Sequence, residues 1–237
     1  MLLFLALPPI LFTAGPADRP RIEILTQSAR PLTPSFHAAC DPAPSFDARR
    51  VLFSGKRTAA DSWQIYELEV ATGKTRQLTT GPHDSRWPAY QSRFFTLDAP
   101  TPWDQAVFVR QGNLHTCTLE GKDCHQITFH AAGEEAGPPA VAWDGRVIYP
   151  LRANGKTRLF AVNLDGTDVA LFSNETADFE RAAPGEDRLY FAAGGMLKSL
   201  SMLRPSLGAK AAAVNAAEPD LLPGGAVLAQ TGQALVR

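Results

Sequence analysis

The sequence has no excess of charge of either sign, since 23 Lys and Arg residues stand against 24 Asp and Glu residues and the formal net charge is -1. It therefore lacks the basic stripe of a nucleic-acid-binding protein, and we expect no nucleic-acid partner. Methionine and cysteine are scarce, at three each, whereas there are 18 Gly and 19 Pro. Because no long amphipathic periodicity accompanies these turn formers, we predict an all-β protein of short strands.

Motifs that carry catalysis or hold cofactors are also missing. The chain has no Cys-x-x-Cys-His, which excludes c-type haem attached by that motif, and no Gly-x-Ser-x-Gly elbow of a serine hydrolase. Gly194-Gly195 and Gly224-Gly225 are typical of hairpin turns and do not form a phosphate-binding loop. We therefore expect no cofactor, and the absence of these motifs favours a non-enzymatic role.

The N-terminus allows two interpretations. Residues 1–14 form an apolar stretch with small residues near its end, as in a signal peptide, but they lack a basic n-region and contain Pro8-Pro9. The stretch is too short to span a membrane. Alternatively, Pro9 to Ala14 is the first strand of a sheet, and a short signal lies ahead of it. Export to the periplasm or the medium is our expectation, with no membrane span.

A repeated unit runs through the chain, and Asp41 to Thr80 shows it best. This stretch predicts strands at Arg50 to Ser54, Gln64 to Val70 and Arg76 to Thr79, with a tight turn over 71–74. In the second strand, alternation places Tyr66, Leu68 and Val70 on the better-buried face. A Pro-containing lead-in precedes each unit, and six occur, at Pro8, Asp41, Trp87, Gly137, Ala183 and Glu218.

The other strands of the unit recur as well. Alternating strands begin at Arg21, Gln64, Asn113, Arg158 and Met196, and three of them end in a Gly-bearing turn. A short last strand follows in three units, reading Arg-Pro-Leu-Thr at Arg30, Arg-Gln-Leu-Thr at Arg76 and His-Gln-Ile-Thr at His125. A period of about 40 to 50 residues is typical of propeller blades.

These residues resemble the TolB-type β-propeller repeat. The match is best through Ser45-Phe46-Asp47, Trp63-Gln64-Ile65-Tyr66 and the run from Arg76 to Pro82, and it weakens after Arg181. The resemblance implies five to six four-stranded antiparallel blades in a single domain over residues 9–237. Because the last lead-in is followed by only one or two strands, the propeller is either incomplete or closed by both termini.

A narrower resemblance joins the runs His37 to Asp47 and Asn113 to Cys117 to propeller modules of envelope proteins related to the hydrazine synthase α subunit. Those proteins pair the propeller with c-type haem, for which this chain has no attachment motif. The resemblance therefore implies architecture and not chemistry.

The three cysteines differ in their setting. Cys117 and Cys124 flank the turn 119–123, so a disulfide across a hairpin and two unpaired thiols are both open interpretations. Cys40 is left over, and we expect it to be buried packing at the start of a blade.

Metal chemistry is the weaker hypothesis. His115, His125 and His130 fall in one unit with Gln126 nearby, and some propeller lyases acting on acidic sugars hold a metal with His and Gln. No short spacing such as His-x-His joins them. Ordinary surface histidines are favoured, and a metal-dependent lyase or hydrolase with a site in the central channel stays as the alternative function.

Aromatic residues give the lead on binding. Trp63, Trp87, Trp103 and Tyr90 cluster in two neighbouring units; Trp63 and Trp87 occupy positions that normally pack between blades, while Trp103 lies with Asp104 in a long loop. We select Trp103, Asp104, Trp87 and Tyr90 as candidate binding residues. The predicted function is a non-catalytic propeller of the cell envelope that recognises a protein or peptide partner.

Overall fold

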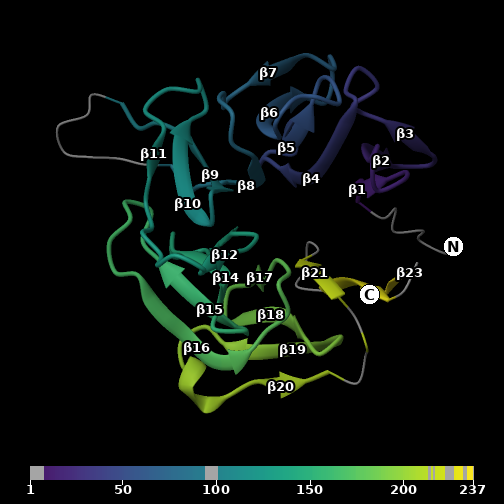
Figure 1. Ribbon diagram of the computed structural model, residues 1–237. Helices are drawn as coiled ribbons and strands as arrows, with labels where there is room; N and C mark the ends of the chain where they lie inside the picture. Colours follow the sequence, from purple (N-terminus) through teal and green to yellow (C-terminus); the bar gives the residue numbers. More distant parts are fainter. Residues whose placement is uncertain are drawn as a thin grey trace, which may run out of the picture. The chain divides into compact units, whose positions relative to one another are not determined.

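The computed structural model describes residues 8–93, 101–212, 215, 217–221, 227–231 and 234–236. These residues divide into two compact units, 1–90 and 91–237, and each is described by itself (Figure 1). Within them the elements are strands, apart from one 3-10 turn at Pro205–Leu207 (η1). The prediction of an all-β chain with little helix is confirmed. Residues 1–7, residues 94–100 and the Gly224-Gly225 turn lie outside the described part.

The first unit holds a three-stranded sheet in the order β1-β2-β3 and a four-stranded sheet in the order β4-β5-β6-β7, both antiparallel. A further strand, β8, packs against β4, β5 and β6. The bounds are β1 Ile10–Ala14, β2 Arg21–Leu25, β3 Ala29–Pro31, β4 Ala38–Pro44, β5 Arg50–Lys56, β6 Gln64–Glu69, β7 Thr75–Gln77 and β8 Ser85–Tyr90.

The second unit continues the same pattern with antiparallel sheets that follow chain order: β9-β10-β11, then β12-β14-β15-β16 with β13 on β14, then β17-β18-β19-β20, and finally β21-β22-β23. The bounds are β9 Gln105–Arg110, β10 Asn113–Thr118, β11 His125–Gln126, β12 Glu135–Ala136, β13 Ala140–Val141, β14 Val147–Ala153, β15 Lys156–Val162, β16 Ala170–Thr176, β17 Ala183–Pro184, β18 Arg188–Ala193, β19 Met196–Ser201, β20 Lys210–Ala211, β21 Ala217–Leu221, β22 Val227–Thr231 and β23 Ala234–Val236.

The Pro-containing lead-ins are themselves strands. The one at Asp41 lies in β4, which pairs with β5 and carries a bulge between Cys40 and Ala43. The lead-in at Ala183 begins with β17, which pairs with β18. The N-terminal stretch is a strand as well, because Ile10 to Ala14 pairs with Arg21 to Leu25. A signal peptide ahead of it stays a prediction.

The threonine that ends the short last-strand motif of the repeat makes the same hydrogen bonds in three sheets. Its hydroxyl is buried and accepts a hydrogen bond from a backbone N–H of the preceding long strand, while the residue before it donates its own N–H to the carbonyl of that same residue. The hydroxyl bonds are Ile22 N to Thr33 (3.1 Å), Ile65 N to Thr79 (2.8 Å) and Leu114 N to Thr128 (2.8 Å).

Strand β6 is buried on both faces. Ile65 and Glu67 are buried like Tyr66 and Leu68, and only Glu69 at the end of their face is exposed, so the two faces differ less than the alternation alone suggests. The physical reason is packing on both sides of the sheet, which takes the charged Glu67 inside together with its partners. On one side the apolar core of the unit comprises Ile22, Ile24, Leu32, Ala39, Phe53, Tyr66 and Leu68.

Gly55 shows how closely this core is packed. Phe36 lies edge-on to both Phe53 and Tyr66, with ring centroids 5.0 and 4.8 Å apart. A Cβ at position 55 would stand 2.9 Å from the Phe36 ring. Only glycine leaves room for the aromatic group at this point of β5.

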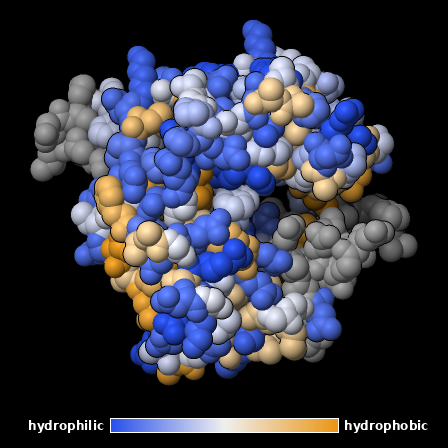
Figure 2. Space-filling model, viewed as in Figure 1, coloured by the Kyte–Doolittle hydropathy of each residue, from blue (hydrophilic) through white to orange (hydrophobic). Residues whose placement is uncertain are grey.

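The surface is mixed in character. Figure 2 shows a face that is largely hydrophilic, with apolar side chains gathered in separate patches. Within the described residues, no helix has the length and apolar character needed to cross a bilayer.

We predict that replacing Thr79 by valine lowers the free energy of unfolding by about 1–3 kcal/mol, because the substitution leaves the buried Ile65 N–H without its acceptor. Urea titration followed by circular dichroism measures the change. Thr26→Val is the matched control, since Thr26 is exposed, and it should change stability by less than about 0.5 kcal/mol. Equal losses in the two variants would contradict this role for Thr79.

Candidate functional site

Asp41 is the centre of a charged cluster in the first unit. The bulge in β4 gives it a left-handed backbone (φ 56°) and turns its carboxylate toward β5 and β8. Arg86 of β8 donates to both carboxylate oxygens, from Nε at 2.8 Å and from Nη2 at 3.2 Å. The Ser54 hydroxyl donates at 2.6 Å and the Trp87 N–H at 3.3 Å. The carboxylate is therefore fully engaged.

Electrostatics keep this carboxylate charged. Burial by itself would raise the pKa of Asp41, but the hydrogen bonds and positive charge of Arg86, helped by Ser54 and Trp87, hold that pKa below its ordinary value. The neighbouring Cys40 responds in the opposite direction. Burial and the Asp41 charge raise the pKa of its thiol, so Cys40 stays a protonated packing residue and not a nucleophile. The expectation that Cys40 is buried is confirmed.

Two tryptophan rings flank the Arg86 guanidinium. The guanidinium carbon, Cζ, lies 4.6 Å from the ring centroid of Trp63 and 5.4 Å from that of Trp87, and both tryptophans are half-buried. The Lys56 ammonium lies 5.2 Å from the Trp63 centroid. Cations at these distances over indole rings are attracted to the ring face. Trp63, Arg86 and Trp87 thus form a partly exposed surface, called here the Trp-Arg surface, whose geometry Asp41 fixes.

Trp87 adopts a backbone conformation that a bulky residue rarely takes, with φ 54°. Its N–H also donates to Ser54 Oγ at 3.2 Å, in addition to the bond to Asp41. A non-glycine residue held in this region costs on the order of 1–3 kcal/mol and persists only where the surroundings enforce it. Such outliers cluster at functional sites, so two adjoining ones, Asp41 and Trp87, mark this surface as a candidate site.

Tyr90 belongs to a second, buried network. Its hydroxyl donates to Glu67 at 2.9 Å, and Arg50 (3.3 Å) and Arg76 (2.6 Å) donate to the same carboxylate. Burial, followed by the Glu67 charge, raises the pKa of Tyr90, so the phenol stays protonated. This network ties β5, β6, β7 and β8 together.

The four predicted binding residues are divided between the units. Trp87 lies on the Trp-Arg surface, whereas Tyr90 is 7% exposed and faces Glu67. In the second unit Trp103 is half-buried, and Asp104 forms a two-bond ion pair with Arg93 at 3.0 and 3.2 Å. Their common role in binding stays a prediction. Sequence reasoning missed Asp41 and Arg86, because nothing in the local pattern relates residues 45 positions apart.

The three histidines of the second unit have separate surroundings. His115 stacks on Phe108 and burial lowers its pKa; His125 is exposed beside the Asp123 carbonyl; and His130 Nε2 lies 3.2 Å from the Tyr149 hydroxyl, where burial lowers the pKa of the imidazole. In the part of the chain that the structure describes, no three His, Cys, Asp or Glu side chains are grouped as metal ligands.

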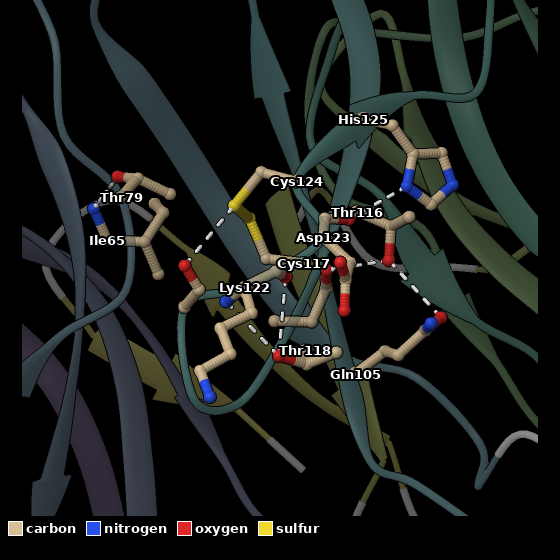
Figure 3. Close-up of a disulfide and its surroundings, with 12 residues drawn as sticks. Ile65, Thr79, Gln105, Thr116, Cys117, Thr118, Lys122, Asp123, Cys124 and His125 are labelled. Carbon is tan, nitrogen blue, oxygen red and sulfur yellow. Dashed lines mark hydrogen bonds between the residues drawn. A yellow bond between two sulfur atoms is a disulfide. The ribbon is translucent and has the colours of Figure 1, made fainter.

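Cys117 and Cys124 are joined by a disulfide that clasps the hairpin between β10 and β11 (Figure 3). Cys117 is fully buried, whereas Cys124 is exposed. The turn between them is ordered by the Thr118 hydroxyl, which contacts both Lys122 N and Lys122 O. Disulfides of this kind persist in oxidising compartments and are rare in the cytosol.

Comparison with known proteins places the fold. No family model and no curated protein matches the chain. Among solved structures, it is similar to Kuenenia stuttgartiensis hydrazine synthase (TM-score 0.72, 16% identity, 94% of this chain and 42% of that one) and to TolB from Acinetobacter baumannii (TM-score 0.60, 15% identity, 82% and 49%).

Other similar structures carry other functions. One is oligogalacturonate lyase from Vibrio parahaemolyticus (TM-score 0.58, 10% identity, 92% of this chain and 70% of that one). The chain has the β-propeller fold, which confirms the fold that the TolB-type resemblance implied. It spans less than half the length of the hydrazine synthase and TolB chains. Because propellers serve many roles, the likeness does not fix a function.

We predict that Asp41→Asn lowers stability at pH 7 by about 3 kcal/mol, because it leaves Arg86 without a charged partner. Asparagine tolerates the positive φ, so the substitution isolates the charge. The folded-state pKa of Asp41 is lowered, so its contribution is present above about pH 4 and is lost as the pH falls through that pKa.

Urea unfolding at a series of pH values measures this. The difference between wild type and Asp41→Asn should shrink below about pH 4. Asp18→Asn, at an exposed position, should match wild type throughout. A difference that stays constant at every pH would contradict the assignment.

We predict that the double substitution Cys117→Ala, Cys124→Ala costs about 2–3 kcal/mol, because the disulfide no longer constrains the unfolded chain. Thermal melting with and without dithiothreitol supplies the comparison. Reductant should lower the Tm of the wild-type protein to near that of the double variant and leave the variant unchanged. A wild-type Tm that does not change with reductant would show that the disulfide does not stabilise the protein.

Proposed function

We propose that this chain is a non-catalytic binding module of the cell envelope and that the Trp-Arg surface recognises a protein or peptide partner. The observation that carries the proposal is the Arg86 guanidinium fixed over Trp63 and Trp87 by a two-bond ion pair to Asp41. Tryptophan and arginine are the residue types most enriched where binding energy concentrates. Because Asp41 holds the arginine in place beforehand, little side-chain entropy is lost on binding.

The chemistry of the cluster favours binding over catalysis. Each polar group around Asp41 already has a partner, and the adjacent Cys40 thiol is held in its protonated, unreactive form. No described side chain stands next to Ser54 as a general base other than Asp41, whose charge is neutralised by Arg86. These groups build a rigid surface and leave no nucleophile to activate.

Two features support a location in the cell envelope. The Cys117–Cys124 disulfide fits an exported protein, and the apolar N-terminal stretch fits a signal ahead of β1. Similarity to TolB and to hydrazine synthase agrees with this location without defining a partner. On this proposal the protein is periplasmic or secreted.

The test places a photoreactive phenylalanine analogue at His83. This exposed residue lies in the loop 81–84, which hydrogen-bonds to Ser62, Trp63 and Gln64. Illumination of an intact envelope preparation should give one dominant adduct at position 83. The adduct should be lost with Trp63→Ala or Arg86→Met and retained with Trp143→Ala, since Trp143 is an exposed tryptophan of the other unit.

An adduct that persists in both Trp63→Ala and Arg86→Met would contradict a role for the Trp-Arg surface. The alternative function, a metal-dependent lyase or hydrolase in the central channel, is favoured by the likeness to oligogalacturonate lyase alone. Stoichiometric metal in protein purified from its own envelope, together with cleavage of an acidic oligosaccharide, would establish that alternative.

A further inference from the structure

Strand β16 is a long outer strand with an open edge. It is last in its sheet and runs for seven residues, whereas the corresponding last strands β3 and β7 have three and β11 and β20 have two. Proteins usually keep exposed edge strands short, because unpaired N–H and C=O groups along an edge invite another strand to pair. The length of β16 departs from that rule, although register shifts interrupt its pairing with β15 between Leu171 and Thr176.

Only the second half of this edge is covered within the described part of the second unit. Near its end, β16 packs against η1, and Glu175 accepts a hydrogen bond from Ala209 N at 3.1 Å and lies 3.7 Å from Lys198. Val169, just before the strand, and Leu171, near its start, are 44% and 41% exposed, whereas Phe172 and Ser173 are buried. In Figure 2, orange side chains gather at the lower left, where β16 runs in Figure 1.

The exposed apolar residues extend an ordered row across the sheet. Leu171 pairs with Phe160 and Phe160 with Tyr149, so the three side chains lie on one face. Tyr149 is fully buried, with its hydroxyl against His130, and Phe160 is half-buried. The row is therefore closed at its inner end and open at β16, where a further strand could continue it.

The charged residues of the segment that contains β16 have one sign, although Lys198 and Arg146 reach the strand from neighbouring parts of the sheet system. Residues 163–176 contain Asp165, Asp168 and Glu175 and no Lys or Arg. Glu175 is paired with Lys198, whereas Asp165 and Asp168 accept hydrogen bonds from Thr167 and Asn163 and form no ion pair with any described residue. The open start of β16 therefore presents apolar side chains along the strand and acidic side chains in the loop just before it.

We propose that the first half of β16 is a docking edge for an extended segment of another protein, one with alternating apolar residues flanked by Lys or Arg. The segment adds as a new strand: its main chain bonds to the open edge, its apolar side chains continue the row beyond Leu171, and its cations face Asp165 and Asp168. This surface lies in the second unit and is independent of the Trp-Arg surface, so neither proposal rests on the other.

The test uses a synthetic peptide, Lys-Val-Thr-Val-Thr-Ile-Lys, titrated into the ¹⁵N-labelled full chain. Amide shifts should change at 168–173 and saturate, whereas the same peptide with Glu at both ends should bind at least about fivefold more weakly, the effect of two rim charges. A version N-methylated at every residue has no N–H to donate on either edge, so it cannot complete the strand pairing and should not bind.

Variants locate the effect. The double substitution Asp165→Asn, Asp168→Asn should weaken the basic peptide about fivefold and remove its preference over the acidic one. Leu171→Thr should weaken both peptides, while Leu203→Thr, at an exposed leucine elsewhere in the same unit, should not. Unchanged Tm values show that each variant folds.

Trp63→Ala should retain peptide binding, which separates this test from that of the proposed function. Equal affinity for the basic and acidic peptides, undiminished binding of the N-methylated peptide, or shifts that do not include residues 168–173 would each overturn the docking edge.

Discussion

A sheet of three or four short strands cannot bury its own two faces, and this constraint shapes the whole chain. Strand β6 shows the consequence, because residues on both of its faces are buried, among them the charged Glu67. Burying a carboxylate requires that it be paired, and Glu67 takes Arg50, Arg76 and Tyr90 as partners from three other strands. The polar networks of the first unit follow from the need to cover each sheet on both sides.

The same constraint explains the site. Where β4 meets β8, a bulge places Asp41 between the strands, and Arg86 and the Trp87 N–H donate hydrogen bonds to its carboxylate. Holding Asp41 and Trp87 at positive φ costs free energy, which the ion pair and hydrogen bonds offset. The result is an arginine and two tryptophans held in one arrangement at the surface, a combination suited to recognition.

Periodicity and turn chemistry predicted the fold well. The repeated last-strand pattern located Thr33, Thr79 and Thr128, each of which caps a neighbouring strand, and the Gly-bearing turns located the hairpins. The site was harder to foresee. Glu67 looks like a surface residue in an alternating strand, and Asp41 and Arg86 meet only because β4 and β8 pack together. Contacts between sheets leave no local signal, so a single sequence does not reveal them.

Asp41 and Arg86 act as one unit that organises the Trp-Arg surface. The most direct test is a double-mutant cycle with Asp41→Asn and Arg86→Met, followed by urea unfolding at pH 7. We expect a coupling free energy of about 1–3 kcal/mol between the two positions, as is typical of residues in one charged network. Substitution effects that add to within about 0.5 kcal/mol would show instead that Asp41 and Arg86 act independently of each other.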